Sequence, residues 1–284
     1  MGRERVEWPN GARVVIATHV FMEEWSGSRV GPGLHTASGI PEEAVRAGKK
    51  DLITLSWAEY AGKVGIWRLR DVVEKYGVAV SAAFSGLAVE RIPDAARAFK
   101  ERGDEIVAHS YAQDIRSWML DVDAERENIR RCVHIIEGAT GQRPVGWISP
   151  GGQASENTVR LLTEEGFLHY GDYAGDDLPR IEVVDDKKIV AIPFQFEVND
   201  MVICVRWGNP PQAFVDVFKR TFDWMYEDGA HYPGILTLTA HASIFGRPFG
   251  VWAFDEAIRY AKGFPKVWFA CRVDIATWWL QRHG

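Results

Sequence analysis

The sequence predicts a closed or nearly closed α/β barrel of about seven parallel strands, formed by one domain that spans residues 1–284. A chain of 284 residues is long enough to bury one large core. Short apolar runs alternate with longer amphipathic segments along nearly the whole chain. This alternation is typical of parallel strands joined by right-handed crossovers. No low-complexity linker or internal repeat interrupts it.

The expected strands are short runs of mostly apolar residues. The first, residues 13–18, is rich in β-branched side chains and follows an Asn-Gly turn. The later runs have a similar apolar character, and several closely follow a glycine that ends the preceding helix. The seven expected strands are residues 13–18, 78–84, 105–108, 144–148, 189–196, 234–240 and 267–269.

The expected helices carry apolar residues three or four positions apart. The segment 66–76 has this spacing and stops at Gly77, and the next helix begins at Pro93, a residue favoured in a first helical turn. Residues 27–39 hold four glycines and a proline and are expected to form a loop. The expected helices are residues 66–76, 92–103, 123–137, 155–166, 211–227, 252–262 and 274–281.

Composition and charge exclude several classes of function. Lys and Arg (33) minus Asp and Glu (39) give a net charge of −6, and no basic run indicates nucleic-acid binding. No apolar stretch approaches the roughly 18–20 residues of a membrane helix, and the charged N-terminus does not resemble a secretory signal. The three cysteines, Cys132, Cys204 and Cys271, are scattered singly, which argues against a disulfide frame or zinc ribbon. A cytoplasmic protein that acts on a small molecule is expected.

Four polar clusters follow expected strands, where the reacting groups of such barrels lie. They are Glu23-Glu24, His109-Ser110, residues 147–152 and His241. Adjacent carboxylates can supply a proton-accepting base, and a histidine can bind a metal or act as an acid. The glycines after Ser149 can expose backbone N–H groups to an oxyanion. Each cluster alone is as well explained by a solvated loop, a structural histidine or an ordinary turn.

The order and spacing of these clusters resemble the polysaccharide deacetylase superfamily, the NodB-homology fold, in its allantoinase-like and peptidoglycan-deacetylase-like branch. That branch has Tyr-Glu-Glu where this chain has Met22-Glu23-Glu24. The resemblance covers nearly the whole chain and implies a deformed (β/α) barrel, an activity on carbon–nitrogen bonds and a homo-oligomer, either a dimer or a tetramer. Further matching segments are residues 65–69, 102–106, 146–147, 173–179, 192–194, 199–201, 245–248 and 266–269.

Carried over residue by residue, the resemblance assigns roles to four side chains. Glu23 matches the family's catalytic base, and His241 matches the late histidine that protonates the leaving group. Glu24 and His109 match a metal-binding carboxylate and the first metal-binding histidine. Gln113 stands where the second metal-binding histidine belongs. A glutamine is a weak zinc ligand, so a divalent metal such as zinc is expected only at a degenerate site, and no cofactor is certain.

Three functional hypotheses follow. The leading one is hydrolysis of a small amide, cyclic amide or ureide by Glu23, Glu24, His109 and His241. The second is metal-dependent removal of an N-acetyl group from a sugar or peptidoglycan fragment, and the third is a catalytically silent ligand-binding protein. The expected substrate-binding residues are Trp147, Ser149, Gly151, Asp176 and Arg247.

Overall fold

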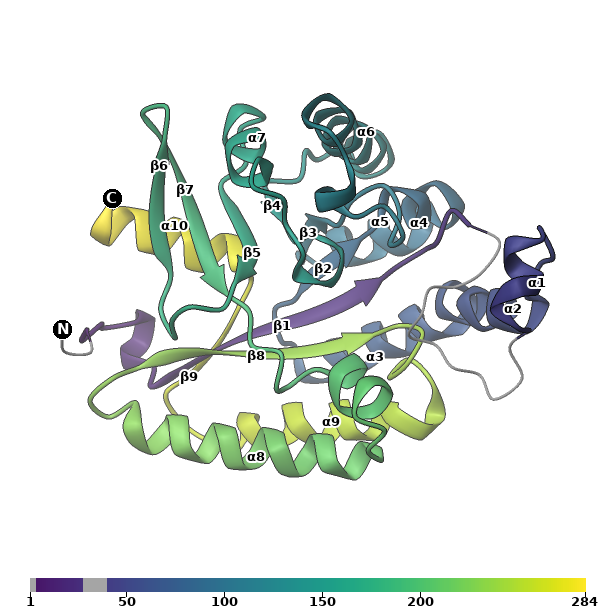
Figure 1. The fold of residues 1–284 in the computed structure, drawn as a ribbon. Helices are drawn as coiled ribbons and strands as arrows, with labels where there is room; N and C mark the ends of the chain where they lie inside the picture. Colours follow the sequence, from purple (N-terminus) through teal and green to yellow (C-terminus); the bar gives the residue numbers. More distant parts are fainter. Residues whose placement is uncertain (1–3, 28–39) are drawn as a thin grey trace.

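The structure, a computed structural model, describes residues 4–27 and 40–284, so the expected loop 27–39 lies almost wholly outside the described residues. Its described strands form one curled, mostly parallel sheet covered by helices (Figure 1). The order is β6-β7-β5-β4-β3-β2-β1-β8, and β9 pairs with β1. The expected deformed barrel is confirmed. The strands are β1 Val14–Met22, β2 Ser81–Phe84, β3 Glu105–Ala108, β4 Gly146–Trp147, β5 His169–Tyr173, β6 Arg180–Val184, β7 Lys187–Pro193, β8 Gly234–His241 and β9 Val267–Ala270.

The helices pack on the outside of the sheet. In Figure 1, α8 and α9 run side by side along β8, α4 to α7 lie on the side of β2 to β5, and α10 lies behind β5 and β7. The α-helices are α1 Glu42–Arg46, α2 Leu52–Tyr60, α3 Ile66–Tyr76, α4 Gly86–Arg91, α5 Pro93–Glu101, α6 Val122–Thr140, α7 Thr158–Glu164, α8 Pro211–Asp228, α9 Pro248–Lys262 and α10 Arg272–His283. Single turns of 3-10 helix are η1 Pro9–Gly11, η3 Ser117–Met119 and η4 Pro150–Gly152, and π-helical turns are η2 Ala61–Gly65 and η5 Met201–Arg206.

Strand β1 pairs with three other strands, and all nine of its residues are buried. It pairs with β8 from Val14 to Phe21 along one edge. Its other edge is shared, because β9 pairs with the first half of β1 and β2 with the second half. A strand buried on both faces is expected to be a continuous apolar run rather than an alternating one. The pairing brings the carboxyl ends of β1, β2 and β8 to one end of the barrel.

The sheet does not close through a regular strand ladder between β7 and β8. Instead, the side chain of Gln195, just after β7, bonds to the β8 backbone: its Nε2 donates to the Ile235 carbonyl (2.6 Å) and its Oε1 accepts from the Thr237 amide (2.8 Å). One parallel bridge, Asn199 with Thr239, follows. The Gln195 amide therefore takes the place of a backbone pair, and this closure holds residues 199–206 against the end of β8.

Strands β5 and β6 were not expected from the sequence. β5 carries polar residues and a glycine, and two of its side chains bond to neighbouring segments inside the barrel: His169 bonds to Glu105 (2.5 Å), and Asp172 accepts from the Ser149 amide (2.8 Å). β6 pairs antiparallel with β7 as an edge hairpin and is only partly buried, so it lacks an apolar signature.

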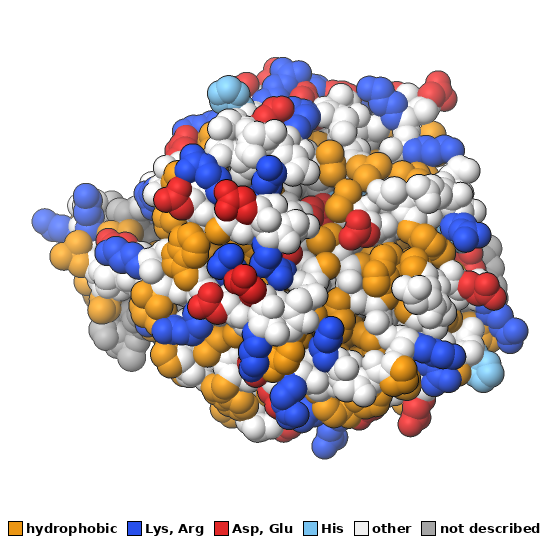
Figure 2. Space-filling model, turned by 180° about the vertical axis from the view of Figure 1, so that it is seen from behind, with side chains coloured by type: hydrophobic (Ala, Val, Ile, Leu, Met, Phe, Trp, Pro, Cys, Tyr) orange, Lys and Arg blue, Asp and Glu red, His pale blue; other side chains and the backbone are white. Residues whose placement is uncertain are grey.

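Two further features concern the surface. Among the described residues, no helix has both the length and the apolar character needed to cross a membrane. Figure 2 shows the face opposite to the view of Figure 1, and there Lys and Arg side chains are interspersed with Asp and Glu. The charges on this face are therefore mixed rather than gathered into an area of one sign.

Candidate active site

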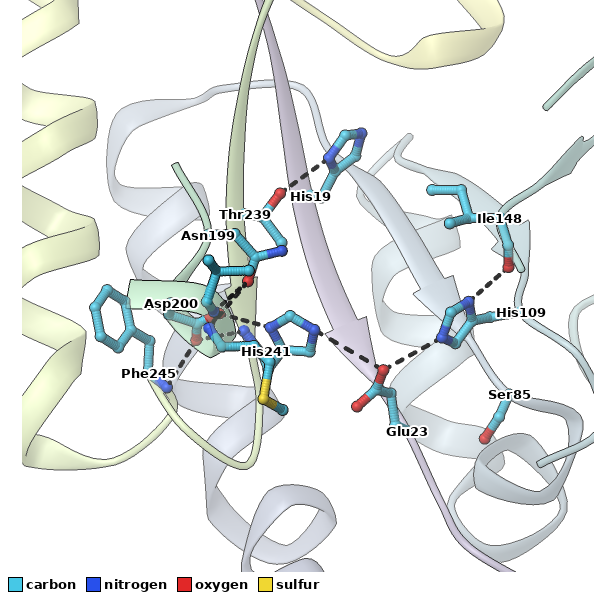
Figure 3. Close-up of polar contacts among 12 residues, drawn as sticks. His19, Glu23, Ser85, His109, Ile148, Asn199, Asp200, Thr239, His241 and Phe245 are labelled. Atoms are coloured by element: carbon cyan, nitrogen blue, oxygen red, sulfur yellow. Dashed lines mark hydrogen bonds and ion pairs between the residues drawn. The ribbon is translucent and has the colours of Figure 1, made fainter. Parts of the chain in front are cut away.

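Three of the expected catalytic residues meet where β1, β3 and β8 end. Glu23 follows β1, His109 follows β3, and His241 is the last residue of β8. Since these strands are parallel members of one sheet, their ends lie at the same rim of the barrel. Figure 3 shows the Glu23 carboxylate between the two imidazole rings.

Glu23 is the centre of this arrangement. Its Oε1 lies 3.2 Å from His109 Nε2 and 3.8 Å from His241 Nε2. The side chain is 4% exposed, and within the described part of the chain its second oxygen, Oε2, is buried without a hydrogen-bond partner. An unpaired buried carboxylate oxygen is costly, so a position like this is expected to receive a hydrogen bond from water or a ligand.

His109 is held from behind by the backbone. Its Nδ1 lies 2.6 Å from the Ile148 carbonyl oxygen. Because a carbonyl only accepts, Nδ1 carries the hydrogen and donates it, which turns Nε2 towards Glu23. The ring also meets Phe21 edge to face, with centroids 5.1 Å apart. Both contacts fix the ring with Nε2 at the Glu23 carboxylate.

His241 is held by Asp200, a residue to which the sequence analysis gave no role. Asp200 Oδ1 accepts a hydrogen bond from His241 Nδ1 (2.6 Å), and Oδ2 accepts from the backbone amides of His241 (2.8 Å) and Phe245 (3.2 Å) (Figure 3). Asp200 is fully buried at the start of η5. Its carboxylate therefore orients the ring and directs Nε2 towards Glu23. The segment 199–201 matched the branch, but only the folded chain brings Asp200 to His241.

The charges around the site lower the pKa of Glu23 and raise the pKa of His241. Burial alone raises the pKa of Glu23, but His241, His109 and Arg116 outweigh it, so the pKa lies below 4.5. Burial alone lowers the pKa of His241, but Asp200 and Glu23 outweigh it, so the pKa lies above 6.5. The pair thus consists of a carboxylate that is more readily ionised than a free one and an imidazole that keeps its proton to higher pH than a free one.

Glu24, expected as a catalytic and metal-binding carboxylate, lies elsewhere. Its Oε2 lies 2.5 Å from Arg91 Nη1, and it does not line the cavity beside Glu23. Neighbouring residues along a strand end point in opposite directions, which explains why Glu23 and Glu24 separate. Burial of Glu24 raises its pKa, and the Arg91 guanidinium opposes that shift.

The residues present do not fit the degenerate metal site that the sequence suggested. Gln113 reaches the cavity but offers a neutral amide, and Asp114 accepts both its hydrogen bonds from Ser26 (2.8 Å each). The Glu24 carboxylate is engaged by Arg91. Across residues 4–27 and 40–284, no group of three or more His, Cys, Asp or Glu side chains is arranged to hold a metal ion. The pairing of Glu24 with His109 at a metal stays a prediction.

The turn after β4 lines the site with fewer free amides than expected. The Ser149 amide donates to Asp172 (2.8 Å), and the Gly152 amide donates to the Ser149 carbonyl (2.8 Å). Pro150 has no N–H, so of this turn only the Gly151 amide is left for an oxyanion. Gly151 has a φ of +68°, a conformation that favours glycine. Burial raises the pKa of Asp172, although its bonds to Ser149 oppose this.

Three expected substrate-binding residues do not reach the cavity. Trp147 is fully buried and donates its Nε1–H to Ser149 Oγ (2.9 Å), so it supports the turn from below. Asp176 caps its own turn by accepting from the amides of residues 177 and 178. The Arg247 guanidinium stacks 3.7 Å from the centre of the Trp57 ring and 4.0 Å from that of Tyr60. Ser149 and Gly151 do line the cavity.

A cavity of about 210 Å³ opens beside Glu23. This volume suits a small ligand, since pockets for drug-sized molecules are typically about 300–1,000 Å³. Gln113 is 7% exposed there, and its Oε1 is buried without a partner within the described ranges. The lining combines an aromatic and aliphatic wall with polar groups: Phe21, Trp25, Ile148, Phe194, Phe196, Met201 and Val202, then Glu23, His109, Gln113, Arg116, Ser149, Asn199, Arg206 and His241, with Gly151 and Gly152.

The sequence of the chain is similar to those of known polysaccharide deacetylases. The sequence profile described as "Polysaccharide deacetylase" matches residues 47–169. A peptidoglycan deacetylase of Helicobacter pylori is 22% identical over 256 residues, which cover 79% of this chain and 86% of that protein.

Two solved structures are closer in sequence. A crystal structure described as a probable polysaccharide deacetylase from Pseudomonas aeruginosa PAO1 is 32% identical and has a TM-score of 0.89, with 99% of this chain and 95% of that one covered. PuuE allantoinase is 31% identical, with a TM-score of 0.87 and the same coverage. The chain therefore belongs to the polysaccharide deacetylase family.

Proposed function

We propose that the chain hydrolyses a carbon–nitrogen bond, other than a peptide bond, in a small amide, cyclic amide or ureide. The observation that carries this proposal is the Glu23 carboxylate between two oriented imidazoles, with Oε2 buried and unpartnered within the described residues. An ionised base next to a proton-donating histidine is the pair that amide hydrolysis requires. The 31% identity to PuuE allantoinase supports the ureide class.

In the first step Glu23 acts as the general base. Its lowered pKa keeps it ionised at neutral pH, and Oε2 is free to accept a hydrogen bond from a water molecule in the cavity. As the water oxygen forms a bond to the substrate carbonyl carbon, its proton passes to Glu23. The carbonyl oxygen becomes an oxyanion, and the Gly151 amide is the donor of the neighbouring turn that remains for it.

In the second step His241 acts as the general acid. Asp200 and Glu23 raise its pKa, which increases the share of the enzyme in which Nε2 carries a proton at neutral pH. When the carbon–nitrogen bond breaks, this proton passes to the departing nitrogen, which would otherwise leave as an unstable anion. The proton on Glu23 and the neutral His241 then exchange with solvent to restore the starting state, so the net reaction consumes one water molecule.

Gln113 supports a substrate that contains N–H groups. Gln113 lines the cavity, and its Oε1 is buried without a partner in the described part of the chain, so an amide or ureide N–H that reaches it can supply the missing donor. The carboxamide also matches the donor and acceptor pair of an amide edge. An ester would leave this oxygen unpaired, which favours nitrogen-containing substrates.

N-deacetylation of a sugar or peptidoglycan fragment is the second candidate, and the names of the relatives favour it. The metal ligands on which the sequence-based version of that hypothesis depended do not fit, because Glu24 is paired with Arg91 and Gln113 is neutral. A catalytically silent protein is the least favoured, since Glu23, His109 and His241 meet in one oriented set.

Release of amine, ammonia or acetate from a panel of amides, hydantoins, ureides and N-acetyl sugars tests the proposal. Glu23→Gln keeps the shape of the side chain but removes the base, and His241→Asn removes the acid. Each is expected to lower kcat about 10²- to 10⁴-fold. Glu127→Gln, an exposed change on α6, is the matched control. Full activity of a folded Glu23→Gln protein would refute the assignment.

A further inference from the structure

Two arginines line the cavity from different loops. Arg116 lies between β3 and η3, and Arg206 is the last residue of η5. Within residues 4–27 and 40–284, no hydrogen bond or ion pair joins either guanidinium to an acceptor of the protein. A guanidinium offers five donors in a fixed fork, and it binds carboxylates in preference to most other groups. The two side chains therefore present unused donors to whatever enters the cavity.

The acidic groups nearby are already engaged. Glu23 is held between His109 and His241, and Asp200 accepts from His241 and from backbone amides. The charge of Asp114 raises the pKa of Arg116, but both carboxylate oxygens of Asp114 accept hydrogen bonds from Ser26. The cavity lining thus contains two guanidinium groups and one carboxylate, whose Oε1 lies beside the two histidines.

The side chain of Arg116 packs against the turn beside the site. Its Nη1 would lie 2.6 Å from a Cβ atom added at Gly151, so the guanidinium rests against the glycine of the turn beside the site. Burial lowers the pKa of Arg116, and the like charge of Arg206 lowers it further, although Glu23 opposes both effects. An anion bound by both guanidiniums would relieve the repulsion between them.

We infer that the substrate is a small amide or ureide that bears a carboxylate group, which Arg116 and Arg206 bind while Glu23 and His241 act on the carbonyl. This inference rests on the proposed function and names the substrate class of the same site. The aromatic wall formed by Phe194 and Phe196 then covers the apolar part of the molecule. An excess of positive charge in a cleft also draws anionic substrates to it.

Binding of matched probes tests the inference. N-Acetylglycine, N-carbamoylglycine and hydantoin-5-acetic acid are each compared with their uncharged N-methylamides, by calorimetry on the Glu23→Gln protein and by turnover on the wild type. The charged member of each pair is expected to bind about 10- to 100-fold more tightly, the usual value of a hydrogen bond to a charged group. Arg116→Gln and Arg206→Gln should each reduce that preference, and the loss should appear mainly as a higher KM for the charged probes.

Arg220→Gln, an exposed change on α8, is the matched control and should leave the preference intact. If Arg116 served only as a counter-ion of Glu23, its loss would weaken the binding of charged and uncharged probes alike. That result overturns the inference, as does equal binding of the two members of each pair, or no binding of the charged probes at millimolar concentration.

The two proposals fail in different ways. Turnover of the neutral probes at the same kcat/KM as the charged ones would support the hydrolase proposal and refute the inference that the substrate bears a carboxylate. Arginine-dependent binding of the charged probes without any hydrolysis would support the carboxylate inference and refute the hydrolase proposal.

Discussion

Replacing Asp200 with asparagine tests the role of His241 at a residue that does not line the cavity. Asp200 Oδ1 accepts the His241 Nδ1 hydrogen at 2.6 Å, and Oδ2 accepts from the backbone of His241 and Phe245. Asparagine keeps one oxygen for these donors and nearly the same volume. It removes the negative charge beside the imidazole, so the change acts on charge and tautomer more than on packing.

The size of the effect follows from the pKa of His241. Burial lowers this pKa, and Asp200 is the largest influence that raises it, ahead of Glu23. Without the charge of Asp200 the pKa falls, and less of the enzyme carries the proton that the leaving nitrogen needs. We expect kcat to fall within the range of about 10²- to 10⁴-fold that an oriented proton donor contributes.

The pH dependence of the rate shows in which direction the pKa of His241 changes. A general acid works only while protonated, so the rate falls as pH rises through the pKa of His241, which lies above 6.5 in the wild type. In Asp200→Asn this basic limb should move to lower pH, whereas the acid limb set by Glu23, below 4.5, should stay.

The assay is the initial rate of amine or ammonia release between about pH 3 and 9, a range that covers the titration of both a carboxylate and a histidine. The unfolding temperature is followed in parallel, because the variant loses a buried charged hydrogen bond. A basic limb that stays in place, together with an unchanged kcat, would show that His241 is not the proton donor. A double variant with His241→Asn should lose little more than His241→Asn alone, since the two residues act as one unit.

Three further outcomes are expected. Glu24→Gln should leave kcat nearly unchanged and cost at most about 1 kcal/mol of stability, because its carboxylate pairs with the half-exposed Arg91 outside the cavity; kinetics and urea unfolding measure both. Gln195→Met should lower stability by about 1–3 kcal/mol, since it leaves the Ile235 carbonyl and Thr237 amide unpaired, and thermal unfolding measures this. The stability that ionised Glu23 contributes is present above pH 4.5 and should be lost as pH falls through its lowered pKa, which acid titration of the unfolding temperature would detect.

The sequence predicted the barrel because its buried parallel strands are mostly apolar runs, such as β1 and β8. It also placed Glu23, His109 and His241 at strand ends, which the parallel sheet brings together. These residues were accessible to sequence reasoning because the site depends on strand order and on polar groups that directly follow apolar runs.

The features that were missed depend on side-chain contacts between distant segments. Asp200 and His241 are separated by 41 positions, and only the Gln195 bridge to β8 brings the segment after β7 beside His241. Asp172 lies in a strand without an apolar pattern, because it faces inward and holds Ser149. The different directions of Glu23 and Glu24 follow from the end of β1, a detail that adjacency in sequence hides.

The positive charge near Glu23 comes from the chain's own side chains. His241, His109 and Arg116 together overcome the effect of burial on the pKa of Glu23. The residue that matches the family's metal-binding carboxylate, Glu24, meanwhile pairs with Arg91, and the neutral Gln113 reaches the cavity. These differences act in one direction, because a site that keeps its base ionised through two histidines and Arg116 has less need of a metal ion held by carboxylate ligands. The same arginines then remain available for an anionic substrate, so the electrostatics of catalysis and of recognition depend on shared residues.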